Sequence, residues 1–134
     1  MCIRDRNIPD KAAFFAAVRD LLAPGGRFVV YDIMAIGDAS SVEYPMPFAS
    51  NPGGAFLASP DDYVAALAAA GFEVGSPVDR TRLSLDAAAA AGVNGPPPVS
   101  LATVMGPDFA TMFANLGAAL RGGALAPIEI VSTC

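Results

Sequence analysis

The spacing of hydrophobic residues predicts a helix near the start of the chain. Proline is favourable in the first turn of a helix and keeps the residue before it out of helical geometry. The helix is therefore expected to lie between Pro9 and Pro24, with Lys11 on its solvent-facing side. The residues that repeat at helical intervals and form its apolar face are Phe14, Phe15, Val18, Leu21 and Leu22.

A hydrophobic run bounded by turn residues predicts the first strand. Gly25 and Gly26 supply a sharp reversal, and residues 27–32 follow with the sequence RFVVYD. Such a run is typical of a strand that is buried on both faces and has neighbours in its sheet. Helix, turn and strand together form half of a β-α-β unit, so we expect a preceding strand that this chain does not supply.

The remaining pattern alternates helices and strands. Residues 33–58 form a connection rich in Gly, Pro and Ser, with the length of a lid or binding loop. Ser59 as cap and Pro60 in the first turn predict a second helix, which ends at Gly71. The later expected elements are a strand from residue 72 towards 80, a helix over 82–91, a break over 92–98, a helix over 108–121 and a strand over 127–133.

The composition leaves little charged surface for a free-standing domain. The chain has 134 residues, the size of one domain at most. Only 16% of its residues are charged, against a usual value of about 25%. This deficit predicts that some apolar surface is covered by a second copy, in a homo-oligomer, or by a part of the domain that the chain lacks.

Charge and residue types exclude several classes of function. The net charge of −5 argues against a nucleic acid or a membrane surface as partner, because both attract clusters of Lys and Arg. The absence of histidine excludes His-ligated zinc and a Ser-His-Asp site, and Cys2 and Cys134 have no neighbour at metal-binding spacing. We expect a cytoplasmic protein without a metal site, a membrane span or a secretory signal.

Several segments resemble the region around the fifth strand of class I S-adenosylmethionine-dependent methyltransferases. In that family a helix ending in Leu-basic-Pro-Gly-Gly leads into the strand; here Ala23 replaces the basic residue. The similar segments are Asn7-Ile8-Pro9-Asp10-Lys11, Leu22-Ala23-Pro24-Gly25-Gly26-Arg27-Phe28, Tyr31-Asp32, Ser59-Pro60-Asp61, Ala70-Gly71-Phe72-Glu73-Val74 and Pro127-Ile128-Glu129-Ile130.

The resemblance implies a fold, a cofactor and a kind of substrate. The implied fold is α/β: the C-terminal half of a Rossmann-like methyltransferase sheet, with helices between the strands and an antiparallel last strand. The implied cofactor of the intact enzyme is S-adenosyl-L-methionine. The segment Tyr44-Pro45-Met46-Pro47-Phe48-Ala49 resembles the loop of sarcosine and dimethylglycine N-methyltransferases, which implies a small-molecule methyl acceptor.

One family feature is missing from the sequence. The family's Gly-rich cofactor loop follows its first strand, and a ribose-binding acid ends its second strand. No Gly-x-Gly arrangement follows a strand here, so we expect this chain alone to bind S-adenosylmethionine poorly or not at all. Residues 1–6 resemble a translated sequencing-adapter remnant, and we expect residues 7–134 to be the C-terminal part of a single methyltransferase domain.

Four residues are candidates for the site. Asp32 is expected at the carboxyl end of its strand, where open α/β sheets bind ligands, and there it would orient an amine acceptor or take its proton; a loop-capping role is the alternative. Tyr44 and Phe48 would bind substrate by enclosing a methylammonium group, unless they only pack the lid onto the body. Asn7 stands where the family's fourth strand has just ended, a region that touches cofactor and acceptor.

Two other classes of protein compete with this interpretation. The first is a non-catalytic interaction or dimerisation module, in which the strand at residues 27–32 should be paired or covered on both edges. A truncated enzyme should instead leave one edge open. The second, the tail of an oxidoreductase, is disfavoured because no Tyr-x-x-x-Lys pair exists and Lys11 is the sole lysine.

Overall fold

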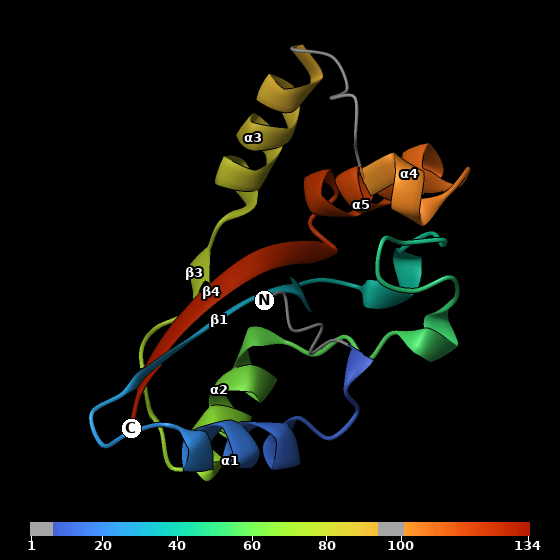
Figure 1. The fold of residues 1–134 in the computed structure, drawn as a ribbon. Helices are drawn as coiled ribbons and strands as arrows, with labels where there is room; N and C mark the ends of the chain where they lie inside the picture. Colours follow the sequence, from blue (N-terminus) through green and yellow to red (C-terminus); the bar gives the residue numbers. More distant parts are fainter. Residues whose placement is uncertain (1–6, 94–100) are drawn as a thin grey trace.

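The structure is a computed structural model that describes residues 7–93 and 101–134. The predictions for residues 1–6 and for positions 94–98 of the break lie outside this range. The break was expected to begin at residue 92, which is wrong, because the preceding helix continues to Val93. The elements in chain order are α1 (Lys11–Leu21), β1 (Arg27–Ala35), the 3-10 turns η2 (Ala39–Ser41) and η3 (Pro52–Gly54), α2 (Pro60–Ala69), β2 (Glu73–Val74), β3 (Val78–Asp79), α3 (Thr81–Val93), α4 (Leu101–Met105), α5 (Phe109–Arg121) and β4 (Leu125–Thr133) (Figure 1).

The first helix begins and ends close to the predicted positions. Asp10 is its N-cap and accepts a hydrogen bond from the backbone N–H of Ala13, which satisfies one of the free donors of the first turn. Phe15 is fully buried. Leu21, the last residue of the helix, is 86% exposed, so its predicted place on the buried face is wrong.

Lys11 is buried, which contradicts its predicted place on the solvent-facing side. Its ammonium group donates hydrogen bonds to the carbonyls of Ile8 (3.2 Å) and Phe56 (3.0 Å). It also lies 5.2 Å from the centre of the Tyr63 ring, a cation–π distance. Lys11 therefore ties the start of α1 to the long connection, a contact between distant segments that helical periodicity does not reveal.

The sheet contains one central strand with antiparallel neighbours. The strand order is β1-β4-β2, and β3 also pairs with β4. All three pairings are antiparallel. The α/β fold with an antiparallel last strand is thus confirmed, while the strand expected over residues 72–80 forms the two short strands β2 and β3.

The first strand is longer than predicted and only one of its faces is buried. Val30 and Met34 are buried, together with Asp32 between them, whereas Val29 and Tyr31 are each 52% exposed. The prediction of a strand buried on both faces is therefore wrong for the part of the chain that the structure describes. The pattern of large apolar residues on both faces is nevertheless that of an internal strand.

β1 is an edge strand, and its hydrogen bonds show which of its backbone groups face away from β4. Ile36 N–H donates to Ala124 C=O (3.1 Å), and Cys134 N–H donates to Gly26 C=O (2.9 Å). In an antiparallel ladder such pairs recur at every second residue, so even-numbered residues of β1 face β4 and odd-numbered residues face away. Within the described residues, the backbone N–H groups of Val29 and Tyr31 find no partner at this edge.

The two helical layers lie on opposite sides of the sheet. In Figure 1, α1 and α2 pack together on one side, while α3 and α5 lie on the other. The main core is formed between the sheet and the first pair of helices. Its buried members are Phe15, Val30, Met34, Tyr63, Leu67, Phe72, Ala126, Ile128 and Ile130.

Candidate functional site

The long connection folds onto α5 at the carboxyl end of β1. Met46 and Phe48 from the connection and Leu125 from the start of β4 are buried in a second apolar cluster. The side-chain amide of Asn115 donates a 3.0 Å hydrogen bond to the carbonyl of Pro45. The connection is thus held against α5 by apolar packing and by one polar anchor.

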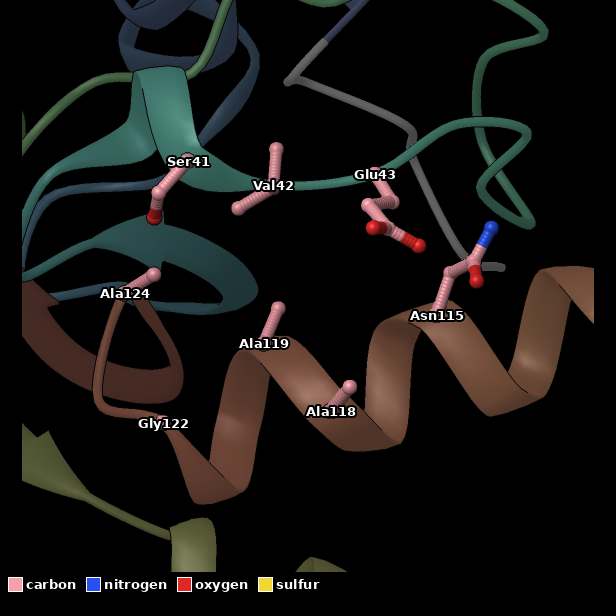
Figure 2. Close-up of a pocket in the computed structure, with 8 residues that line it drawn as sticks. All are labelled: Ser41, Val42, Glu43, Asn115, Ala118, Ala119, Gly122 and Ala124. Carbon is pink, nitrogen blue, oxygen red and sulfur yellow. The ribbon is translucent and has the colours of Figure 1, made fainter.

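A cavity of about 330 Å³ lies between the beginning of the connection and the last turns of α5. Because β4 is antiparallel to β1, the start of β4 lies beside the carboxyl end of β1, next to the cavity. Open α/β sheets bind their ligands at the carboxyl ends of their strands. The residues that line the cavity are Ser41, Val42, Glu43, Asn115, Ala118, Ala119, Gly122 and Ala124 (Figure 2).

The polar lining of this cavity consists of two side chains from the connection and one from α5. In Figure 2 the carboxylate of Glu43 extends from the connection towards α5, near Asn115. Glu43 is exposed and makes no ion pair or hydrogen bond within the described residues. The Ser41 hydroxyl donates a 2.6 Å hydrogen bond to the carbonyl of Asp38, which turns the connection at this point.

Asp32 lies inside the core, three residues before the end of β1. It is 3% exposed. Its carboxylate accepts hydrogen bonds from the hydroxyl of Tyr63 (2.8 Å) and from the backbone N–H of Ile33 (2.8 Å), which faces the open edge of the sheet. The strand continues to Ala35, past its predicted end at Asp32. The contacts of the Asp32 carboxylate support a positioning role, and its catalytic role stays a prediction.

Tyr44 and Phe48 both pack against the cluster that holds the connection on α5. Phe48 is 7% exposed and Tyr44 is half-buried. Burial raises the pKa of the Tyr44 phenol above its usual value. The packing agrees with the alternative in which these rings hold the lid, and their predicted contact with substrate stays a prediction.

Asn7 lies between the start of α1 and the connection. Its amide nitrogen donates hydrogen bonds to the carbonyls of Phe48 (3.0 Å) and Gly54 (2.8 Å). Its amide oxygen is buried and accepts no hydrogen bond from the residues that the structure describes. A buried acceptor without a donor is costly, and this atom is the one feature of Asn7 that suits its predicted contact with a ligand.

The sequence interpretation missed Glu43 and Asn115. A signal for Glu43 was present, because it is the only charged residue between positions 39 and 60 and directly precedes the Tyr44 segment. No comparable signal existed for Asn115, which lies on a helix 70 residues from its partner Pro45. Their proximity depends on how the connection folds back onto α5.

Comparison with known proteins shows similarity at the level of structure. No protein-family model matches the sequence, and a search of curated proteins finds no match. Among solved structures, the chain is similar to residues 942–1257 of the StiE O-MT, with 18% identity, a TM-score of 0.52 and coverage of 94% of this chain and 39% of that one.

The chain is also similar to two further solved structures. For phosphoethanolamine N-methyltransferase 2 of Haemonchus contortus, in complex with S-adenosyl-L-methionine, the identity is 10%, the TM-score 0.55 and the coverage 96% of this chain and 30% of that one. For the [4+2]-cyclase SpnF the identity is 17%, the TM-score 0.50 and the coverage 91% of this chain and 43% of that one.

These neighbours define the fold and its extent. The fold of the chain matches part of the Rossmann-like fold of these solved structures, as predicted, and the chain spans 30–43% of the length of the solved structures that it matches. Because SpnF is a cyclase, the fold by itself does not fix the reaction.

The described residues do not form a cradle for the nucleotide cofactor. A Gly-rich cofactor loop follows a strand and lets a ligand approach the backbone. Gly37 follows β1, but a Cβ there would lie 2.5 Å from the carbonyl of Gly123, so its close approach is to the protein's own backbone. The glycines with positive φ follow helices instead: Gly25, Gly71, Gly106 and Gly123.

Two other kinds of site are absent from the described residues. No group of His, Cys, Asp and Glu side chains there is placed to hold a metal ion. Of the helices in residues 7–93 and 101–134, none has the length and hydrophobicity needed to cross a membrane.

Proposed function

We propose that this chain is the C-terminal part of an S-adenosylmethionine-dependent methyltransferase that acts on a small molecule. The observation that carries the proposal is the open edge of β1, where Val29 and Tyr31 present unpaired N–H groups within the described residues. A strand with apolar residues on both faces and one free edge is suited to receive another strand. The partial coverage of the structural neighbours supports the same interpretation.

In this proposal the chain forms the acceptor side of the intact enzyme. The preceding part of the enzyme would hold S-adenosyl-L-methionine, because the described residues lack the cradle. The cavity between the connection and α5 lies at the carboxyl end of β1, and the carboxyl ends of strands are where α/β proteins bind ligands. The chain's contribution to methyl transfer would be to hold and orient the acceptor.

The proposed roles of individual residues follow their surroundings. Asn7 contacts the ligand through its buried amide oxygen. Tyr44 and Phe48 pack in the apolar cluster that shares Val42 and Ala119 with the cavity, and through it they hold the connection beside the acceptor. Asp32 supports the end of β1 through its contact with Ile33 N–H. Its predicted part in proton transfer is tested by Asp32→Asn in the intact enzyme. A loss of activity by the same factor at all pH values, with the shape of the pH profile unchanged, would indicate a positioning role only.

A cofactor titration tests the proposal. Calorimetry with S-adenosyl-L-methionine should show no binding to this chain up to about 1 mM, whereas the protein extended by its recovered upstream coding sequence should bind at about 1–100 μM. The matched control is S-adenosylhomocysteine with both proteins. Micromolar binding by this chain, or no binding by the extended protein, would contradict the proposal.

A non-catalytic module is the alternative function. Its supporting observation is a second, largely apolar cavity of about 570 Å³ between α3, α5 and the exposed face that carries Tyr31. The open edge of β1 argues against this alternative, because a functional module should pair or cover that strand. A stable dimer of this chain in solution, with the β1 edge protected, would favour the module.

A further inference from the structure

We propose that the cavity between residues 41–43 and α5 binds a small organic ammonium ion. The binding of the ion is argued from the cavity alone. Only its role rests on the proposed function: if the intact enzyme is a methyltransferase, the ion is its methyl acceptor, and the acceptor is an amine. Three properties of the cavity carry the inference: the kind of polar groups that line it, the helix end that faces it, and its size.

The one charged side chain among the described lining residues is a hydrogen-bond acceptor. Glu43 provides the only charged group of the lining, and its carboxylate makes no hydrogen bond or ion pair within the described residues. Asn115 donates one amide N–H to the carbonyl of Pro45 and keeps its amide oxygen as an acceptor and its second N–H as a donor. A ligand that satisfies the Glu43 carboxylate must donate hydrogen bonds, and an ammonium group carries donors and no acceptor.

The end of α5 adds a favourable potential for a cation. Ala118, Ala119 and Gly122, in the last turn and cap of α5, line the cavity. The C-terminus of a helix carries a partial negative charge that attracts cations. Together with the Glu43 carboxylate, this helix end disfavours an anion such as phosphate. Among the described residues, no Lys or Arg lines the cavity; Arg121, in the last turn of α5, lines the second cavity instead.

The walls and the size limit the ligand to a short alkyl chain. Val42 and the alanines at positions 118, 119 and 124 form the apolar part of the lining. A volume of about 330 Å³ is at the small end of ligand pockets, which range from about 300 to 1,000 Å³. The chemistry therefore fits an ion with one ammonium head and a few carbon atoms.

The test is a titration of the ¹⁵N-labelled chain with butylammonium chloride, followed by NMR at constant ionic strength. The neutral probe 1-butanol has the same number of heavy atoms and serves as the matched ligand. The expected result is saturable shifts at Glu43, Asn115 and Ala119, with a Kd of about 1 mM or below, and much weaker shifts with 1-butanol. Equal binding of the two probes, or no saturable shift below about 50 mM ammonium, would overturn the proposal.

Two variants and one control assign the effect to the cavity. Glu43→Gln removes the charge of an exposed side chain and should raise the Kd by roughly twofold to fivefold. Ala118→Leu fills the cavity from an exposed helical position and should abolish the shifts. Asp61→Asn removes an equally exposed acid on α2 and should leave the Kd unchanged. An unchanged Kd in both cavity variants would refute the site.

The titration separates this inference from the proposed function because it contains no cofactor. If the ammonium ion binds in the cavity but the extended protein does not bind S-adenosyl-L-methionine, the proposed function fails and the site stands. If the extended protein binds the cofactor but the cavity does not bind the ion, only this inference fails.

Discussion

Tyr63→Phe should destabilise the chain strongly for the loss of a single oxygen atom. The Tyr63 hydroxyl donates a 2.8 Å hydrogen bond to the Asp32 carboxylate, and the two residues are 1% and 3% exposed. Removing a hydrogen bond to a buried charged group costs about 2–3 kcal/mol. With an unfolding entropy of roughly 2.1 cal/mol/K per residue, this corresponds to a fall in Tm of about 7–11 °C.

The matched control is the same substitution at Tyr31. Its hydroxyl is 2.9 Å from the Ser84 hydroxyl in an exposed pair, so Tyr31→Phe should cost about 0.5 kcal/mol or less. Urea unfolding followed by circular dichroism gives both values, provided that the slope of free energy against urea is unchanged. Equal losses of stability in the two variants would refute the argument that the Asp32–Tyr63 pair stabilises the core.

Two further substitutions test local features, each by urea unfolding. Ser59→Ala removes the N-cap of α2 and should cost about 1 kcal/mol at pH 7. The Ser59 hydrogen bonds lower the pKa of Asp62, so their stabilisation is present above pH ~4, the unfolded value, and is lost as pH falls through the lower folded pKa; a loss independent of pH would contradict this. Gly37→Ala should cost about 1–3 kcal/mol, because its Cβ would lie 2.5 Å from the Gly123 carbonyl. Gly54→Ala meets only a side-chain carbon at 3.7 Å and should change stability by about 0.5 kcal/mol or less.

Local signals in the sequence predicted most of the elements. The Ser59-Pro60 start of α2 is confirmed as a capping box in which Asp62 completes the pair. In the final strand, Ile128 and Ile130 alternate with Glu129 in the sequence, and both isoleucines are buried. These features depend on residues close in sequence, where capping chemistry and periodicity are informative.

The errors concern contacts between distant segments. Lys11 was assigned to solvent because its partners, the carbonyl of Phe56 and the ring of Tyr63, are more than forty residues away. Asp32 was predicted at the carboxyl end of its strand, although the strand continues to Ala35 and the Asp32 carboxylate bonds to Tyr63 in the core. Periodicity identifies which residues share a face, but it does not reveal what covers that face.

The cavity lay beyond prediction for the same reason. Glu43 and Asn115 come together only because residues 42–57 pack onto α5 through a cluster that includes Met46 and Phe48. The sequence suggested a lid over this region, and the structure gives that lid an anchor at Asn115. The position of an unpaired carboxylate beside a helix C-terminus can be recognised only from the folded chain.

The most direct test of the central claim is amide hydrogen exchange along β1, measured by NMR on this chain and on the protein extended upstream. In this chain, the N–H groups of Val29 and Tyr31 should exchange rapidly, while those of Val30 and Asp32, which face β4, should be protected. The extended protein should protect all four. Equal protection of all four in this chain alone would contradict the account, because the edge of β1 would then already be paired.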